Sequence, residues 1–233
     1  MPGRLAIYDD ISFKKDIINT FDFIDDKIQR LNKRYNIAPT IQIPVYLNTK
    51  VYTYAHFGLI PSWAKDRSSM NINARSETIF EKKSFREAYK QRRCLIPLNG
   101  WYEWTKNELT NKSIPNIIIP KDKNYFAIAG IYEQWYDNAT RQIVLSCALI
   151  TTKPNKKISA IHDRMPVILQ QKDWQKWLNN NTTYEELNTL FKPYSSDKTD
   201  IYEVNEIVNS VANDKPSCIK KSCKLGMIQG SLF

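Results

Sequence analysis

The 233 residues are enough for one large domain or two small ones, and a chain of this size can bury a substantial core. Its formal net charge of +10 favours a polyanionic partner such as nucleic acid. No apolar run approaches the roughly 18 residues of a membrane-spanning helix, and polar residues such as Asp9, Asp10 and Lys14 exclude a signal peptide. We therefore expect a cytoplasmic protein with no membrane segment.

The chain opens with a predicted helix and a predicted β-hairpin. Ser12 can cap a helix over residues 12–34, because apolar residues recur there at near-helical spacing. Two strands are expected at 41–47 and 51–59, joined by a hairpin turn at 48–50. The helix is expected to pack on the sheet that these strands begin.

The middle and end of the chain are rich in strand signals, with Ile, Val, Tyr and Phe bounded by turn-forming residues. The expected elements are a helix at 84–92, strands at 95–104, 116–119, 125–135, 142–152 and 167–169, helices at 172–178 and 184–191, and a strand within 201–211. They predict an α+β fold, a single domain over 1–211 around an antiparallel or mixed β-sheet core with peripheral helices. A polar tail over 212–233 follows.

Glu103 is a carboxylic acid among aromatic residues, in the segment Gly100-Trp101-Tyr102-Glu103-Trp104. Burial in such a strand would raise its pKa toward neutrality, where it can act as a general acid and base. The alternative is that strand alternation directs Trp101 inward and leaves Glu103 facing solvent.

Two histidines exist, and they differ in setting. His56 lies within a predicted strand and is interpreted as structural. His162 lies in a charged loop beside Asp163 and Arg164, where an imidazole can transfer a proton near neutral pH. A surface histidine with no role is the alternative.

Polar residues alternate in segment 71–77, where Asn73 and Arg75 could face a groove, or the segment could be a polar edge strand or loop. The spacing of Cys218 and Cys223 lacks a second pair or a nearby histidine to complete a zinc set. We expect no metal and no other cofactor.

Six short motifs follow one another along the chain: Gly3-Arg4, Tyr35-Asn36-Ile37-Ala38-Pro39, Phe57-Gly58 with Pro61 and Trp63, Asn73-Ala74-Arg75-Ser76-Glu77-Thr78, Gly100 to Trp104, and His162-Asp163-Arg164-Met165-Pro166. In order and spacing they resemble the motifs of the SRAP family, the SOS response-associated peptidase family, whose members are the abasic-site processing proteins of bacteria and eukaryotes. The resemblance covers essentially the whole chain.

The resemblance implies binding to abasic sites in single-stranded DNA, particularly at junctions with duplex, and a covalent link between the protein and the ring-opened sugar aldehyde. By position, Asn73 would orient the sugar, Glu103 would relay protons and His162 would assist ring opening. The residues implied to contact DNA are Arg4, Arg75 and Arg164 on phosphates, and Pro39, Trp63 and Trp104 against bases.

Lys83 belongs to a basic stretch over residues 82–93, which suits phosphate contacts. A solvated helix face is the alternative for this stretch.

Pro2 is where the chain departs from the family, in which a cysteine follows the initiator methionine and closes a thiazolidine on the aldehyde. A proline has no thiol, so that ring cannot form. If Met1 is removed, the secondary amine of Pro2 can attack the aldehyde, so we expect a transient Schiff base that ends in hydrolysis or in strand cleavage by a lyase reaction.

Two alternatives to this chemistry stay open. One is a catalytically inactive relative that only binds DNA, and the other is a chain in which an original cysteine was replaced. The peptidase activity once suggested for the family would need the missing thiol and ranks last.

The chain finishes with Gln229-Gly230-Ser231-Leu232-Phe233. This resembles the Gln-x-x-Leu-Phe peptide with which bacterial DNA-processing proteins bind the sliding clamp, where Leu232 and Phe233 would be the anchors beside Gln229. The expected partners are therefore abasic single-stranded DNA and the DNA sliding clamp, and the expected state is a monomer.

Overall fold

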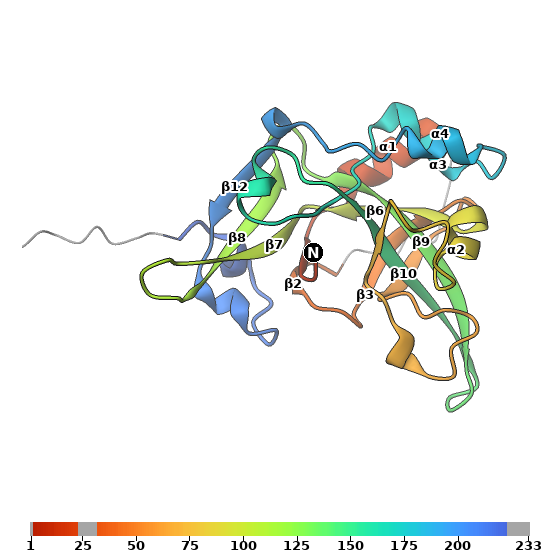
Figure 1. Cartoon of the computed structure of the whole chain (residues 1–233), viewed down its shortest axis with the longest axis horizontal. Helices are drawn as coiled ribbons and strands as arrows, with labels where there is room; N and C mark the ends of the chain where they lie inside the picture. Colours follow the sequence, from red (N-terminus) through yellow and green to blue (C-terminus); the bar gives the residue numbers. More distant parts are fainter. Residues whose placement is uncertain (1, 23–31, 223–233) are drawn as a thin grey trace, which may run out of the picture.

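The computed structural model describes residues 2–22 and 32–222 (Figure 1). Its strands are β1 Leu5–Ile7, β2 Arg34–Ile37, β3 Gln42–Leu47, β4 Tyr52–Phe57, β5 Asn73–Arg75, β6 Arg93–Leu98, β7 Gly100–Lys106, β8 Ser113–Pro120, β9 Phe126–Asp137, β10 Gln142–Thr152, β11 Met165–Pro166 and β12 Thr199–Glu203. Its α-helices are α1 Ile11–Phe21, α2 Arg86–Gln91, α3 Trp174–Leu178 and α4 Tyr184–Asn188. The predicted α+β class is confirmed.

Strands β10, β4, β3, β6 and β9 form a closed ring, because β9 pairs with both β6 and β10. Side chains alternate between two cores along these strands. Val45 and Leu149 belong to one core, whereas their neighbours Tyr46 and Ile150 belong to the other, which also contains Trp174 of α3. Both faces of the ring are therefore buried, which explains why its strands contain nearly continuous apolar runs.

A second sheet has the order β12-β8-β7-β1-β2 and lies beside the ring, at the left of Figure 1. Trp101 of β7 packs in the same core as Val45, so the ring and this sheet share buried side chains. Tyr102 faces the opposite way, into a smaller core with Val208 and Cys218. Residues near the C-terminal end of the described chain thus cover the outer face of the second sheet.

Asn99 separates two strands where the sequence predicted one. The predicted strand at 95–104 is β6, in the ring, followed by β7, in the second sheet. The buried Asn99 side chain accepts hydrogen bonds from Tyr8 N (2.6 Å) and Asp9 N (2.9 Å), and its amide donates to Asp9 O (2.9 Å). These bonds stabilise the point at which the chain crosses from one sheet to the other.

The predicted helix over residues 12–34 is wrong at its C-terminal end. Helix α1 ends at Phe21, where Asp22 adopts a left-handed conformation with φ 49°, and Arg34 begins β2. The strand predicted within 201–211 is shorter, because β12 ends at Glu203. The Asn205 side chain then accepts from Ile207 N and begins a 3₁₀ turn.

Some other local predictions hold. The hairpin of β3 and β4 is confirmed, and β10 has its predicted bounds. The strand predicted at 167–169 is wrong in position, because β11 spans Met165–Pro166 and Ile168 forms an isolated bridge with Ile128. Within residues 2–22 and 32–222, the helices are too short or too polar to cross a bilayer.

Candidate functional site

The N-terminal residues lie beside the strand that carries Glu103. Leu5 of β1 pairs with Trp101 of β7, and Tyr102 donates its backbone N–H to Arg4 O at 2.9 Å. The two residues that precede Arg4 therefore lie toward the end of β7 that carries Glu103.

Pro2 is buried and is bound to a third element, β5. Asn73 donates from Nδ2 to Pro2 O at 2.9 Å. Strand β5 pairs in parallel with β10, where Asn73 lies opposite Leu149, and its middle residue Ala74 points into the core. Asn73 and the exposed Arg75 therefore share the other face of β5.

Glu103 is 5% exposed, which excludes the solvent-facing alternative. It lies on the same face of β7 as Trp101, toward the ring. Burial raises the pKa of Glu103 from an ordinary 4.5 to about 7. The carboxyl group is therefore divided between its acid and base forms near neutral pH, as general acid–base chemistry requires.

His162 brings a second proton-transfer group to Glu103. Its Nε2 atom lies 4.0 Å from Glu103 Oε2. Its Nδ1 atom accepts a hydrogen bond from Arg164 N at 3.0 Å and lies 2.9 Å from Asp163 Oδ1. The Asp163 side chain is 78% exposed. Burial lowers the pKa of His162. Burial therefore favours the neutral imidazole, whose Nε2 atom faces Glu103.

Arg164 forms a forked ion pair with Glu77. Arg164 Nη1 and Nη2 each lie 2.7 Å from a Glu77 carboxylate oxygen, and Nη2 also donates to Thr151 O at 2.7 Å. Hydrogen bonding to Arg164 lowers the pKa of Glu77. If Arg164 binds a phosphate, as predicted, the phosphate must replace Glu77 as its partner. The pairing of Arg164 with Glu77 was not predicted from the sequence.

Arg4 and Trp104 lie together on the outer side of β7. The Arg4 guanidinium is 5.6 Å from the centre of the Trp104 ring, and Trp104 Nε1 donates to Asn209 Oδ1 at 2.7 Å. Arg4 also donates from Nη1 to Asn36 Oδ1 at 2.7 Å. Asn36 occurs in one of the motifs, but nothing in its sequence context indicates a role for it.

Trp63 and Lys83 form a separate pair. The Trp63 side chain is 48% exposed, and Lys83 Nζ lies 4.8 Å from the centre of its ring. Pro39 is half-buried in the loop that follows β2. The exposed ring and the adjacent positive charge are features of sites that bind single-stranded nucleic acid.

The remaining predictions concern the C-terminal motif, the cysteines and metal binding. Gln229, Leu232 and Phe233 lie outside the described residues, as does Cys223. Cys218 is buried in the smaller core. Within the described chain, no group of three His, Cys, Asp or Glu side chains could hold a metal ion.

Comparison with known proteins gives a consistent result. A sequence model of the family described as SOS response associated peptidase (SRAP) matches residues 1–211. The abasic site processing protein YoqW of Bacillus subtilis is 39% identical over 228 residues, which cover 94% of this chain and 99% of YoqW. The abasic site processing protein HMCES of Pongo abelii is 27% identical, over 79% of this chain and 64% of HMCES. A crystal structure of a Bacteroides thetaiotaomicron protein, 28% identical, matches with a TM-score of 0.81 over 94% of this chain and 99% of that one.

Proposed function

Because the chain belongs to the SRAP family, we propose that it binds abasic sites in single-stranded DNA and processes them at the site that holds Glu103 and His162. The observation that carries this proposal is the 4.0 Å approach of His162 Nε2 to Glu103 Oε2, next to the buried N-terminal segment. Two groups that exchange protons near neutral pH are what reaction of an amine with a sugar aldehyde needs.

His162 and Glu103 can carry out the proton transfers that this reaction requires. Opening the sugar ring requires that a proton leave the C1′ hydroxyl and that a proton reach the ring oxygen. The neutral His162 imidazole can accept the first proton and, once protonated, donate a proton to the ring oxygen. A nearby amine then attacks the C1′ aldehyde to form a carbinolamine. Protonated Glu103 donates to the departing hydroxyl, so that water leaves and an iminium ion remains.

Pro2 is the amine that we assign to this step. When Met1 is removed, its nitrogen is a secondary amine, whereas with Met1 in place it is a tertiary amide that cannot react. The overall step consumes one proton and releases one water, and the nitrogen lone pair forms the new bond to C1′. Since Pro2 has no thiol, the iminium is resolved by hydrolysis or by β-elimination of the 3′ phosphate. Asn73 donates to Pro2 O at 2.9 Å, which supports a role for its amide in holding Pro2 and orienting the sugar.

Borohydride trapping tests the proposal. The protein is incubated with a single-stranded oligonucleotide that carries one abasic site, with an intact oligonucleotide as control, and the N-terminus is sequenced. We expect a reduced adduct that peptide mass spectrometry locates at Pro2. If a chain shown to begin at Pro2 yields no adduct and no strand cleavage, the proposed chemistry is refuted. That result would favour the alternative of a non-catalytic DNA-binding protein.

Binding of the sliding clamp through Gln229, Leu232 and Phe233 is a separate proposal. It rests on the sequence pattern alone. Deletion of Leu232 and Phe233 should abolish affinity for the clamp in a direct binding assay, and unchanged affinity would refute it.

A further inference from the structure

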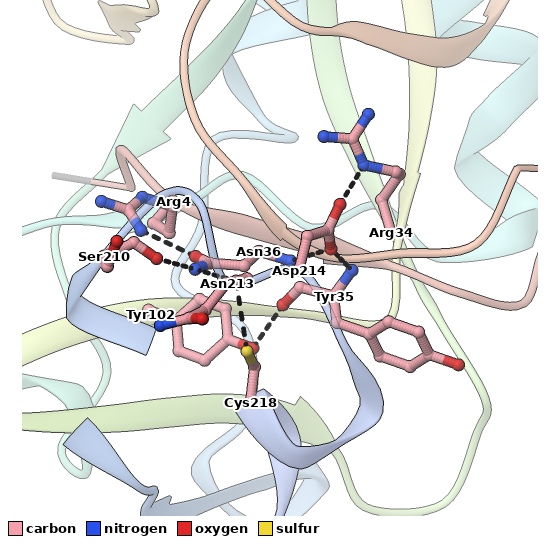
Figure 2. A network of polar contacts seen from close by, with 9 residues as sticks. All are labelled: Arg4, Arg34, Tyr35, Asn36, Tyr102, Ser210, Asn213, Asp214 and Cys218. Atoms are coloured by element: carbon pink, nitrogen blue, oxygen red, sulfur yellow. Dashed lines mark hydrogen bonds and ion pairs between the residues drawn. The ribbon is translucent and has the colours of Figure 1, made fainter. Parts of the chain in front are cut away.

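Asp214 binds the backbone and a side chain of strand β2, although it lies beyond the residues that match the family (Figure 2). Its Oδ1 atom accepts hydrogen bonds from Tyr35 N at 2.5 Å and Asn36 N at 3.0 Å. Its other carboxylate oxygen forms an ion pair with Arg34. A single side chain thus satisfies two adjacent N–H groups of β2 and one arginine.

Asn36 continues this network through its side-chain amide (Figure 2). It is 1% exposed, and its Nδ2 atom lies within hydrogen-bond distance of Val208 O (3.1 Å), Ser210 O (3.0 Å) and Asn213 O (2.7 Å). Two amide protons are shared among these three acceptors. Because the partners are backbone carbonyls, the amide fixes the path of residues 208–213 rather than one side chain.

Residues 204–222 form a closed segment, which we call the C-terminal strap. Its ends are joined by a bridge between Val204 and Lys221, and Ser222 N donates to Glu203 O at 2.8 Å. Cys218 lies fully buried inside it. The strap therefore has a defined shape and its own packing against the second sheet.

Arg4 connects the strap to the N-terminal strand. Its Nη1 atom donates to Asn36 Oδ1 at 2.7 Å and to Val208 O at 3.0 Å, while its backbone carbonyl accepts from Tyr102 N at 2.9 Å. Pro2 precedes Arg4 by two residues.

Strand β1 is buried and lies between β2 and β7, but its pairing with both is short. It pairs with β7 only through Leu5 and Ala6, and its pairing with β2 is irregular between Leu5 and Ile7. A strand of three residues with an irregular edge has little pairing of its own to fix the chain that precedes it. The contacts of Arg4 with Asn36 and Val208 add such a constraint, beside the bond from Asn73 to Pro2 O.

We propose that the C-terminal strap is a positioning element for the reaction: through Asp214 and Asn36 it holds Arg4, and thereby the N-terminal strand that presents Pro2 to Glu103. The inference rests on the proposed function of the same site. Trp104, bound to Asn209 of the strap at 2.7 Å, is held by the same segment. The chain needed for reaction therefore extends beyond residue 211, where the family match ends.

Substitution of Asp214 tests the proposal. Asp214→Ala removes the acceptor for Tyr35 N and Asn36 N, and we expect the single-turnover rate with saturating abasic oligonucleotide to fall about tenfold or more, since small displacements of a reacting group have effects of this size. Asp214→Asn keeps an acceptor oxygen but loses the ion pair with Arg34. Its rate should therefore lie between those of the wild type and Asp214→Ala. If Asp214→Ala does not fold, the comparison of Asp214→Asn with the wild type remains.

Glu133 supplies the matched control. Its carboxylate also pairs with an arginine, Arg92, at 2.9 Å and accepts a backbone N–H, from Gln134, at 3.0 Å, but it lies on β9 of the ring. Glu133→Ala should leave the rate with abasic DNA at the wild-type value.

Hydrogen exchange gives a readout that does not depend on activity. The amides of β1 should exchange faster in Asp214→Ala than in the wild type, while those of β10 stay protected in both. The strap proposal is overturned if every Asp214 variant has the single-turnover rate of the wild type and the same hydrogen exchange at the β1 amides. A wild-type protein that yields no product with abasic DNA would instead overturn the proposed function, and the exchange comparison would still decide whether the strap holds β1.

Discussion

His162 Nε2 and Glu103 Oε2 are 4.0 Å apart, although one residue follows strand β10 of the ring and the other belongs to β7 of the second sheet. This distance is longer than a direct hydrogen bond. A substrate oxygen could therefore lie against both atoms, taking a proton from one and giving a proton to the other.

Glu103→Gln should slow trapping of abasic DNA by about 10²–10⁴-fold, the usual contribution of a general acid–base group. The amide has nearly the shape of the acid but cannot transfer the proton. Single-turnover kinetics with borohydride quenching measure the effect, and affinity for intact single-stranded DNA, which should not change, is the control. A wild-type rate would remove Glu103 from the mechanism.

The same substitution should stabilise the protein at alkaline pH. Burial raises the pKa of Glu103 from 4.5 to about 7, so between these values the folded state holds a proton that the unfolded state has lost, and stability falls as pH rises. The full difference corresponds to about 3 kcal/mol above pH 7 and disappears below pH 4.5. Urea unfolding at pH 4.5 and pH 8 should therefore show a growing advantage of Glu103→Gln over the wild type. A difference that does not change with pH would contradict the raised pKa.

His162 should titrate below its ordinary value of 6.5, because burial lowers its pKa. Its ring protons can be followed by NMR, with His56 as the other histidine signal, assigned through a His162→Gln variant. Asp163→Asn should lower the midpoint further, since the Asp163 carboxylate favours the charged imidazole. A midpoint that rises in this variant would refute the assigned effect of Asp163.

Glu77→Ala should destabilise the fold by about 1–3 kcal/mol, because it leaves the nearly buried Arg164 guanidinium without its carboxylate. Glu77→Gln should cost less, since its amide oxygen can still accept from one Arg164 nitrogen. Urea unfolding of both variants checks the order. Equal stability of Glu77→Ala and the wild type would show that the fork contributes nothing.

Trp63→Ala should weaken binding of single-stranded DNA by about 1–3 kcal/mol, the effect of losing one base-stacking ring. Lys83→Gln should instead reduce the slope of log affinity against log salt by about 1, the effect of one lost phosphate contact. Tyr136, an aromatic residue on β9 that is 52% exposed, provides the control, because Tyr136→Ala should change neither quantity. Fluorescence anisotropy at several salt concentrations makes both measurements.

The sequence alone determined the elements whose causes are local. The hairpin of β3 and β4 and the strand β10 were predicted because apolar residues and turn formers lie in the elements themselves. The aromatic neighbours of Glu103 left both a buried and a solvent-facing side chain open, and the resemblance to the SRAP family implied that Asn73 and His162 act in the same site.

Only the tertiary structure decided how these elements meet. The closing of the ring by β9 and β10, the crossing at Asn99 and the fork between Arg164 and Glu77 depend on residues far apart in the chain. Strand β1 is too short to carry a pattern, and Asp214 lies in a polar segment that resembles a tail. Pairing partners of buried polar groups are set by three-dimensional packing, and no spacing along the sequence records them.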